Sequence, residues 1–330
     1  MLRRTLLPLA AVLLALWLWL GATPSDGPVV RTALVMGTLV EIKAYGADPN
    51  RLDTAITEAF AEMARLEQLF SAHLEQSEIR QLSAARGVRT VSSEVAELLI
   101  LGQMVARRSQ GAFDMGLGRL VALWDLQSES PKVPSGEQIG AALRGTGPES
   151  LTINGQQVKK TDPALQLDLG GIAKGYAVDR AVAVLRQAGV KSAAVNAGGD
   201  IRLLGDRLGE DWRIGIQHPR KAGEVMATIA LRDRSVVTSG DYERFFEQDG
   251  RRYHHLLDPR TGYPARGCQS VTVIAGDAAL ADALATAAFV LGPRAGLALL
   301  ERMTDVEGFV ITDDGQRLVT TGLDGQLQWF

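Results

Sequence analysis

The sequence of 330 residues is poor in the residue types that build several common kinds of site. Its one cysteine, Cys268, cannot form an intrachain disulfide, and four histidines supply too few further ligands for a zinc cage. Aromatic residues make up 5%, the formal net charge is −3, and no basic run is present. We therefore expect no nucleic-acid partner, because binding one needs clustered cations or a stacking platform. Cys268 is expected to be a small buried hydrophobe.

The N-terminus holds the only long apolar run, residues 6–20, which follows Arg3 and Arg4. This pattern is typical of a secretory signal peptide, and the run is short for a full membrane span. However, the exit from the run is a poor cleavage site, and Trp17 and Trp19 suit a membrane interface. We expect residues 1–27 to be either a signal peptide or an uncleaved membrane anchor. No cysteine follows the run, which excludes a lipid-modified N-terminal cysteine.

Residues 28–330 are expected to form one folded unit, because 46% hydrophobic and 22% charged residues are typical of a globular protein. Apolar residues at helical spacing or in alternation predict the elements. Strands and helices come in mixed order with several hairpins, which indicates an α+β fold rather than a regular parallel array. The expected helices span 53–69, 95–109, 175–188 and 277–291, with a short one in the loop 125–147; the expected strands lie within 29–44, 151–169, 192–204, 212–237, 253–257, 270–274, 309–311 and 318–320.

The segment 167–179 (LDLGGIAKGYAVD) reads as a strand, a Gly-Gly turn and a helix. This arrangement lets backbone N–H groups approach an anion at the start of a helix. Lys174 in the first turn is placed to reach a phosphate, and Asp168 at the strand end is placed to accept a ring N–H. The pattern is neither a Walker loop nor a dinucleotide-binding glycine motif. A tight turn with a solvated lysine is the alternative interpretation.

The helix expected over 277–291 is almost entirely apolar but carries Asp282 and Thr286. These residues are four apart and therefore share one face. An unpaired carboxylate would be costly to bury there, and a hard cation with oxygen ligands is a natural partner. The alternative is that Asp282 lies on a solvent-exposed face of the helix.

Three further segments are weaker signals when taken alone. Residues 254–264 place two histidines before a turn, and we favour a solvated position for His254 and a general-base role for His255. The small residues of 195–200 suit either a hairpin turn or close approach to a ligand. Residues 111–114 read as a turn after a helix.

In combination and in this order, these segments resemble the ApbE family of FAD:protein FMN transferases. The resemblance runs from about Thr32 to the C-terminus, and its motifs are specific as an ordered set. It is carried by Met36-Gly37-Thr38, Phe70-Ser71, Ser77-Glu78-Ile79, 111–114, 168–179, 196–200, Thr238-Ser239-Gly240, 255–262, Ala281-Asp282 and Thr286.

The resemblance implies two interleaved lobes of largely antiparallel sheet, with FAD in the cleft between them. It implies Mg²⁺-dependent transfer of FMN from FAD to a threonine hydroxyl of a target flavoprotein, with release of AMP. The implied metal ligands are Asp282, Thr286 and the carbonyl of Gly171, since Gly171 has no side chain to offer. The implied FAD contacts are Met36, His73, Ala112, Phe113, Asp114, Asp168, Lys174 and Leu257.

Family members are typically exported and modify subunits of membrane redox complexes. We therefore expect the protein on the periplasmic side of a bacterial inner membrane, associated with it if residues 1–27 are retained. Two other functions stay open at this point. One is an FAD pyrophosphatase that releases FMN and AMP, and the other is a flavin-binding protein without catalysis.

Overall fold

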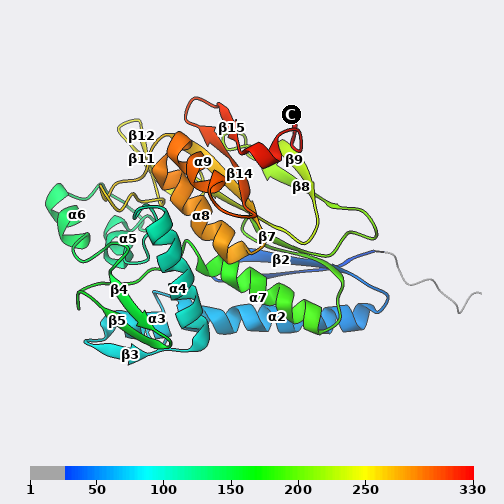
Figure 1. Cartoon of the computed structure of the whole chain (residues 1–330), viewed down its shortest axis with the longest axis horizontal. Helices are drawn as coiled ribbons and strands as arrows, with labels where there is room; N and C mark the ends of the chain where they lie inside the picture. The colour runs from blue at the N-terminus through cyan, green and yellow to red at the C-terminus, as the bar shows by residue number, and fades with distance from the viewer. Residues whose placement is uncertain (1–26) are drawn as a thin grey trace, which may run out of the picture.

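An antiparallel sheet of eight strands crosses the computed structural model, which describes residues 27–330 (Figure 1). Its order is β1-β2-β6-β7-β10-β13-β14-β15. Segments far apart in the chain thus become neighbours, because the first hairpin pairs with β6 and the C-terminal strands close the other edge. The strands are β1 (Val29–Val35), β2 (Thr38–Tyr45), β6 (Ser192–Ala197), β7 (Asp200–Leu204), β10 (Ser235–Gly240), β13 (Cys268–Ala275), β14 (Glu307–Thr312) and β15 (Arg317–Val319).

One face of this sheet is covered by helices whose apolar faces form the largest core cluster. In Figure 1, α2 and α7 lie side by side along the lower edge, and α8 lies above them near the centre. Helix α8 packs on β10 and β13 and is flanked by α4, α7 and α9, so its burial on several sides explains its apolar sequence. The helices are α2 (Pro49–Phe70), α4 (Ser93–Arg108), α7 (Ala173–Gln187), α8 (Ala278–Leu291) and α9 (Pro293–Glu301).

The opposite face of the sheet is covered by a three-stranded sheet of β8 (Trp212–Gln217), β9 (Val225–Leu231) and β16 (Gln328–Trp329). Alternating residues of β8 point inward and form a second core cluster with side chains from the large sheet. The short helix η1 (Thr321–Leu323) adds Leu323 to this cluster. The large sheet is therefore the middle of three layers.

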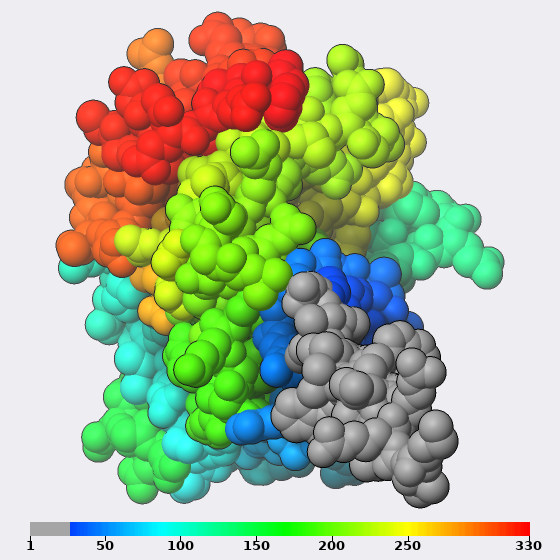
Figure 2. Space-filling view, turned by 90° about the vertical axis from the view of Figure 1, so that its right-hand side faces the viewer, coloured from blue at the N-terminus to red at the C-terminus, as the bar shows by residue number. Residues whose placement is uncertain are grey.

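A third core cluster joins α5 (Gly118–Trp124) and α6 (Gly136–Ala142) to the hairpin of β11 (Phe245–Gln248) and β12 (Arg251–His254). Trp124 lies at its centre. The indole stacks on Tyr253 at 5.7 Å between ring centroids, and its N–H donates to the carbonyl of Gly262 at 2.9 Å. The chain between α5 and α6 projects from the body in Figure 2.

A small sheet of β3 (Val88–Thr90), β5 (Gln157–Lys160) and β4 (Leu151–Asn154) lies at the lower left of Figure 1, next to α3 (Glu78–Ala84). A hairpin joins β4 to β5 where the sequence predicts one, but Asn154 ends β4 and pairs with Gln157, so the two turn residues are Gly155 and Gln156. The prediction of strand was wrong for residues 161–169, which form an irregular segment with only an isolated bridge between Gln166 and Leu117. Side chains and neighbouring loops satisfy its backbone instead of a sheet partner.

The other predicted elements are confirmed, with ends that shift by a few residues. The predicted strand 253–257 is the exception, because β12 ends at His254 and the chain then bends. Asp277 stands at the N-cap of α8 without a capping hydrogen bond from its side chain. The carboxylate of Asp179 on α7 takes that role, since it accepts from the backbone N–H groups of Ala278 and Ala279 at 2.9 Å each.

The signal peptide or anchor expected over residues 1–27 lies outside the described residues except for Gly27. Within residues 27–330, the length and apolar character needed to cross a membrane are not combined in any helix.

Candidate functional site

The Gly-Gly turn and the start of α7 bring several distant segments together. Asp168 precedes the turn, and its N–H donates to the carbonyl of Met115 at 2.8 Å. Its carboxylate accepts from the N–H of Gly170 at 2.8 Å, which fixes the turn. The N-cap residue of α7 is Ile172, whose side chain offers no capping hydrogen bond. The first turn of α7 is therefore a site of positive partial charge.

Gly171 lies against both α8 and the segment after α4. A Cβ atom added at Gly171 would stand 3.1 Å from Oγ1 of Thr286 and 3.3 Å from Cε2 of Phe113. The lack of a side chain at 171 thus lets the backbone approach the Thr286 hydroxyl. Gly171 and Thr286, two of the three predicted metal ligands, are therefore neighbours in space although they lie 115 positions apart in the sequence (286 − 171).

Asp282 is buried, with 3% of its surface exposed, so the alternative of a solvent-exposed position was wrong. Its Oδ2 accepts from the backbone N–H of Gly175 at 3.2 Å. The carboxylate therefore faces the N-terminal turn of α7, where the helix dipole favours a negative charge. Burial, and next the negative charge of Asp200, raise the pKa of Asp282, so the carboxylate is short of positive partners.

Lys174 forms an ion pair with Asp200, with 2.6 Å between Nζ and Oδ2. Asp200 begins β7 after the Gly198-Gly199 turn and is 1% exposed. The sequence pattern of 195–200 does not by itself assign a role to Asp200, although an aspartate directly after two glycines at the start of a strand is a signal for one. A phosphate contact for Lys174 stays a prediction, and its ammonium is bonded to a buried carboxylate.

The turn of Ala112, Phe113 and Asp114 is wholly buried. Both oxygens of Asp114 are used, since Oδ1 accepts from the N–H of Gly116 at 2.7 Å and Oδ2 from that of Gly147 at 2.6 Å. Asp114 thereby fixes the loop that presents the Phe113 ring to Gly171. Burial raises the pKa of Asp114.

His255 follows the end of β12, and its backbone N–H donates to the carbonyl of Arg244 at 3.1 Å. Its Nδ1 is buried and has no hydrogen-bond partner in the described part of the chain. Burial, followed by the charges of His254, Arg244 and Lys174, lowers the pKa of His255 to about 3. The ring is thus a neutral imidazole near neutral pH, and its surroundings in the ligand-free protein disfavour its protonation.

His254 is 3% exposed, so the prediction of a solvated position was wrong. Its Nδ1 accepts from the N–H of Leu256 at 3.3 Å, which places the ring proton on Nε2, 3.0 Å from the carbonyl of Ala265. The ring also packs edge-on against Phe289 of α8 at 5.5 Å. His254 fails to alternate outward because β12 ends there and the chain turns under α8.

The remaining predicted FAD contacts lie on three separate segments. Met36 has φ 54°, which is unusual for a residue with a side chain, and with Gly37 it forms the turn between β1 and β2. Leu257 is buried in the third core cluster. His73 is exposed and bonded through its N–H to Oγ of Ser71 at 3.1 Å. FAD contact stays a prediction for all of them.

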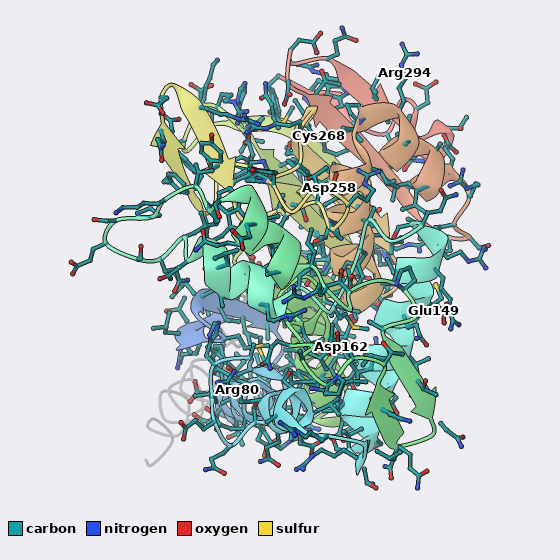
Figure 3. The ribbon with its side chains drawn as sticks, turned by 90° about the vertical axis from the view of Figure 1, so that its left-hand side faces the viewer. Arg80, Glu149, Asp162, Asp258, Cys268 and Arg294 are labelled. Atoms are coloured by element: carbon teal, nitrogen blue, oxygen red, sulfur yellow. The ribbon has the colours of Figure 1, made fainter. Side chains whose placement is uncertain are left out.

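Two other polar residues of interest have structural roles. Figure 3 shows Cys268 and Asp258 in the same half of the molecule, with Glu149 and Asp162 in the other half. Cys268 is buried, as the sequence predicts, and burial raises the pKa of its thiol to about 12, so it is unreactive. Asp258 accepts from the guanidinium of Arg260 at 2.8 Å and shapes its own turn.

The donor set around the α7 turn suits a hard cation. Within residues 27–330, no three His, Cys, Asp or Glu side chains gather in a way that could hold a metal ion. A cation here would therefore depend on one carboxylate, a hydroxyl, a carbonyl and oxygens from a bound substrate. Such a set fits Mg²⁺, which prefers oxygen and commonly uses few protein ligands beside substrate phosphates.

Comparison with known proteins gives a consistent result. The family model described as the ApbE family matches residues 36–310. This chain is 35% identical to the FAD:protein FMN transferase of Rhodobacter capsulatus. The match covers 91% of this chain but only 58% of the Rhodobacter protein. This chain is also 35% identical to the protein of the same name from Treponema pallidum, covering 89% of this chain and 87% of that one.

The fold agrees as well. The crystal structure of the ApbE protein of Thermotoga maritima superposes with a TM-score of 0.83 at 35% identity, covering 91% of this chain and 99% of that one. On the matched family model, the similar sequences and the shared α+β fold, this chain belongs to the ApbE family.

Proposed function

We propose that this protein transfers FMN from FAD to a threonine hydroxyl of a target flavoprotein and releases AMP. The observation that carries the proposal is the buried carboxylate of Asp282, which accepts from the first turn of α7 at Gly175 and lies beside Gly171 and Thr286. A pyrophosphate is a ligand that such a place would bind, through backbone N–H groups and a cation. The names of the relatives point to the same reaction.

In the proposed reaction, the threonine oxygen attacks the phosphorus of the FMN half of FAD. A phosphoester bond forms, the pyrophosphate P–O bond to the AMP half breaks, and AMP leaves with the bond electrons. The threonine proton passes to His255, whose imidazole is neutral and whose Nδ1 is buried without a partner in the described residues. Bound phosphates would raise its affinity for a proton, because their negative charge favours the imidazolium.

The residues that would hold Mg²⁺ are Asp282, Thr286 and the carbonyl of Gly171. When bound, Mg²⁺ supplies neutralisation of the phosphate charge and polarisation of the reacting phosphoryl group. The protein's own residues fix the rest of the site. Asp168 holds the Gly170 N–H, and Asp114 holds the loop that carries Phe113.

The test is incubation of the full chain with FAD, Mg²⁺ and a candidate acceptor domain, followed by intact mass of the acceptor. The acceptor should gain the mass of an FMN phosphoester, and AMP should appear in equal amount. Free FMN with an unmodified acceptor would instead identify a pyrophosphatase. Intact FAD with every component present would identify a flavin-binding protein without catalysis.

We further propose that the protein acts on the periplasmic side of a bacterial inner membrane, on flavoprotein subunits of membrane redox complexes. The support is Arg3, Arg4 and the apolar run 6–20. Fractionation should recover it from the membrane if the segment is retained and from the soluble periplasm if it is cut. Recovery of the full-length chain from the cytosol would contradict both forms.

A further inference from the structure

Lys160 is a buried lysine that the proposed reaction does not use. It ends β5 and is 6% exposed, whereas the preceding residue, Lys159, is exposed on the other face of the strand. Burying an ammonium group is costly unless each of its donors is satisfied. Burial lowers the pKa of Lys160, as expected for a charge removed from water.

All three donors of the Lys160 ammonium have a carbonyl partner. Nζ donates to the carbonyl of Pro163 at 2.8 Å, to that of Leu165 at 3.0 Å, and to that of Ser83 at the end of α3. An ammonium group has three N–H donors, so the site satisfies it fully. Lys160 therefore ties the irregular segment 161–169 to α3 and to the small sheet.

Ser83 completes the attachment of the same segment. Its Oγ accepts from the N–H of Leu167 at 2.9 Å, and it is 2% exposed. The next N–H along, that of Asp168, donates to the carbonyl of Met115 at 2.8 Å. The backbone on the N-terminal side of Asp168 is thus held by Lys160 and Ser83 from one side and by the loop after Asp114 from the other.

This attachment is needed because the segment has no strand partner of its own. It makes one isolated bridge, at Gln166, so side chains must fix the direction in which it delivers Asp168 and the Gly170-Gly171 turn. A shift of about 1 Å in such a segment is enough to cost a large factor in binding or rate.

We propose that Lys160, together with Ser83, is a positioning residue for FAD: it holds segment 163–168 so that Asp168 and the turn after it meet the flavin nucleotide. The inference rests on the proposed function. It assigns Lys160 no contact with substrate and no part in the bond changes.

The experiment measures FAD affinity by flavin fluorescence with Mg²⁺ present, in the full chain, for Lys160→Met, Ser83→Ala and the control Lys159→Met. Lys160→Met should weaken FAD binding about tenfold or more. Ser83→Ala should weaken it less, and Lys159→Met should leave it unchanged. Hydrogen exchange of the peptide spanning 161–170 should accelerate in the first two variants and not in the control.

A double-mutant cycle shows whether Lys160 acts through Asp168. Asp168→Ala should weaken FAD binding, and adding Lys160→Met to it should cost little more, because coupled residues are not additive. If Lys160→Met does not fold, Ser83→Ala with its own cycle decides. If folded Lys160→Met binds FAD as tightly as the parent does, the inference is overturned. The same holds for Ser83→Ala if it has to replace Lys160→Met. A parent that binds no FAD would instead overturn the proposed function, and this inference with it.

Discussion

Replacement of Asp282 by alanine should separate catalysis from folding in this protein. The carboxylate is 3% exposed on α8 and has one hydrogen bond, from the N–H of Gly175 at 3.2 Å. Its loss leaves the buried N–H of Gly175 without that partner, but it also removes a charge that burial and Asp200 disfavour, and the two effects oppose each other. The variant should therefore fold, with a free energy of unfolding without Mg²⁺ within about 1 kcal/mol of the parent value.

The effect on transfer should be large, because Asp282 is the only carboxylate in the proposed ligand set. Breaking a buried charge pair costs about 3–5 kcal/mol. At about 1.4 kcal/mol per factor of ten, the rate at fixed Mg²⁺ should fall roughly 10²- to 10⁴-fold. Thr286→Val should cost less, since it removes one neutral oxygen and keeps the shape of the side chain.

The assay is the rate of acceptor labelling against Mg²⁺ concentration for the parent, Asp282→Ala and Thr286→Val. Asp277→Ala is the matched control, because Asp277 stands exposed at the N-cap of the same helix without a capping bond. Thermal unfolding with and without FAD and Mg²⁺ supplies a second readout, since a ligand at 100 times its Kd adds about 2.7 kcal/mol. A rate and Mg²⁺ dependence for Asp282→Ala equal to those of the parent would refute the assignment.

Three further predictions concern other parts of the chain. His255→Ala should keep the FAD affinity measured by fluorescence while labelling slows by roughly 10²-fold or more, and equal rates would remove it from the mechanism. Gly175→Ala should lower the melting temperature strongly, because its Cβ would stand 2.2 Å from the carbonyl of Ala278, whereas Gly140→Ala on α6 has open space and should raise it slightly. Burial lowers the pKa of His254 to about 4, so the unfolded chain binds more protons below its usual pKa of about 6.5, and stability should fall as the pH drops from about 6.5 to 4. Urea titrations of the parent and His254→Gln check this, and equal pH slopes would contradict the reasoning.

Local sequence patterns predicted much of the fold. Helical spacing of apolar residues located α2, α4, α7 and α8, and the Asn154-Gly155 sequence located a hairpin. Prediction failed where a segment takes its backbone partners from afar. Residues 161–169 alternate like a strand, but their hydrogen bonds go to Lys160, Ser83 and the loop after Asp114, which no local pattern reveals.

The candidate site divides in the same way. The sequence by itself determined the inventory, which is one carboxylate and one hydroxyl a helical turn apart, a Gly-Gly turn before a helix, and the ordered motifs of the ApbE family. Spacing along a helix is a local property, so it survives without knowledge of the fold. The sequence could not show whether Asp282 is buried, because an apolar helix can still have one exposed face.

Only the tertiary structure decided which groups meet. In the folded protein Asp282 is buried against the start of α7, and Lys174 forms an ion pair with Asp200 instead of facing solvent. His254 points inward and packs against Phe289 of α8. The tertiary structure also gave α8 its cap from Asp179 instead of Asp277. Each of these pairings joins segments far apart in the chain. They form because a charge or a backbone N–H that is buried without a partner costs free energy, so the folded state is one in which these groups are paired. That cost depends on the packed surroundings, which the order of residues alone does not display.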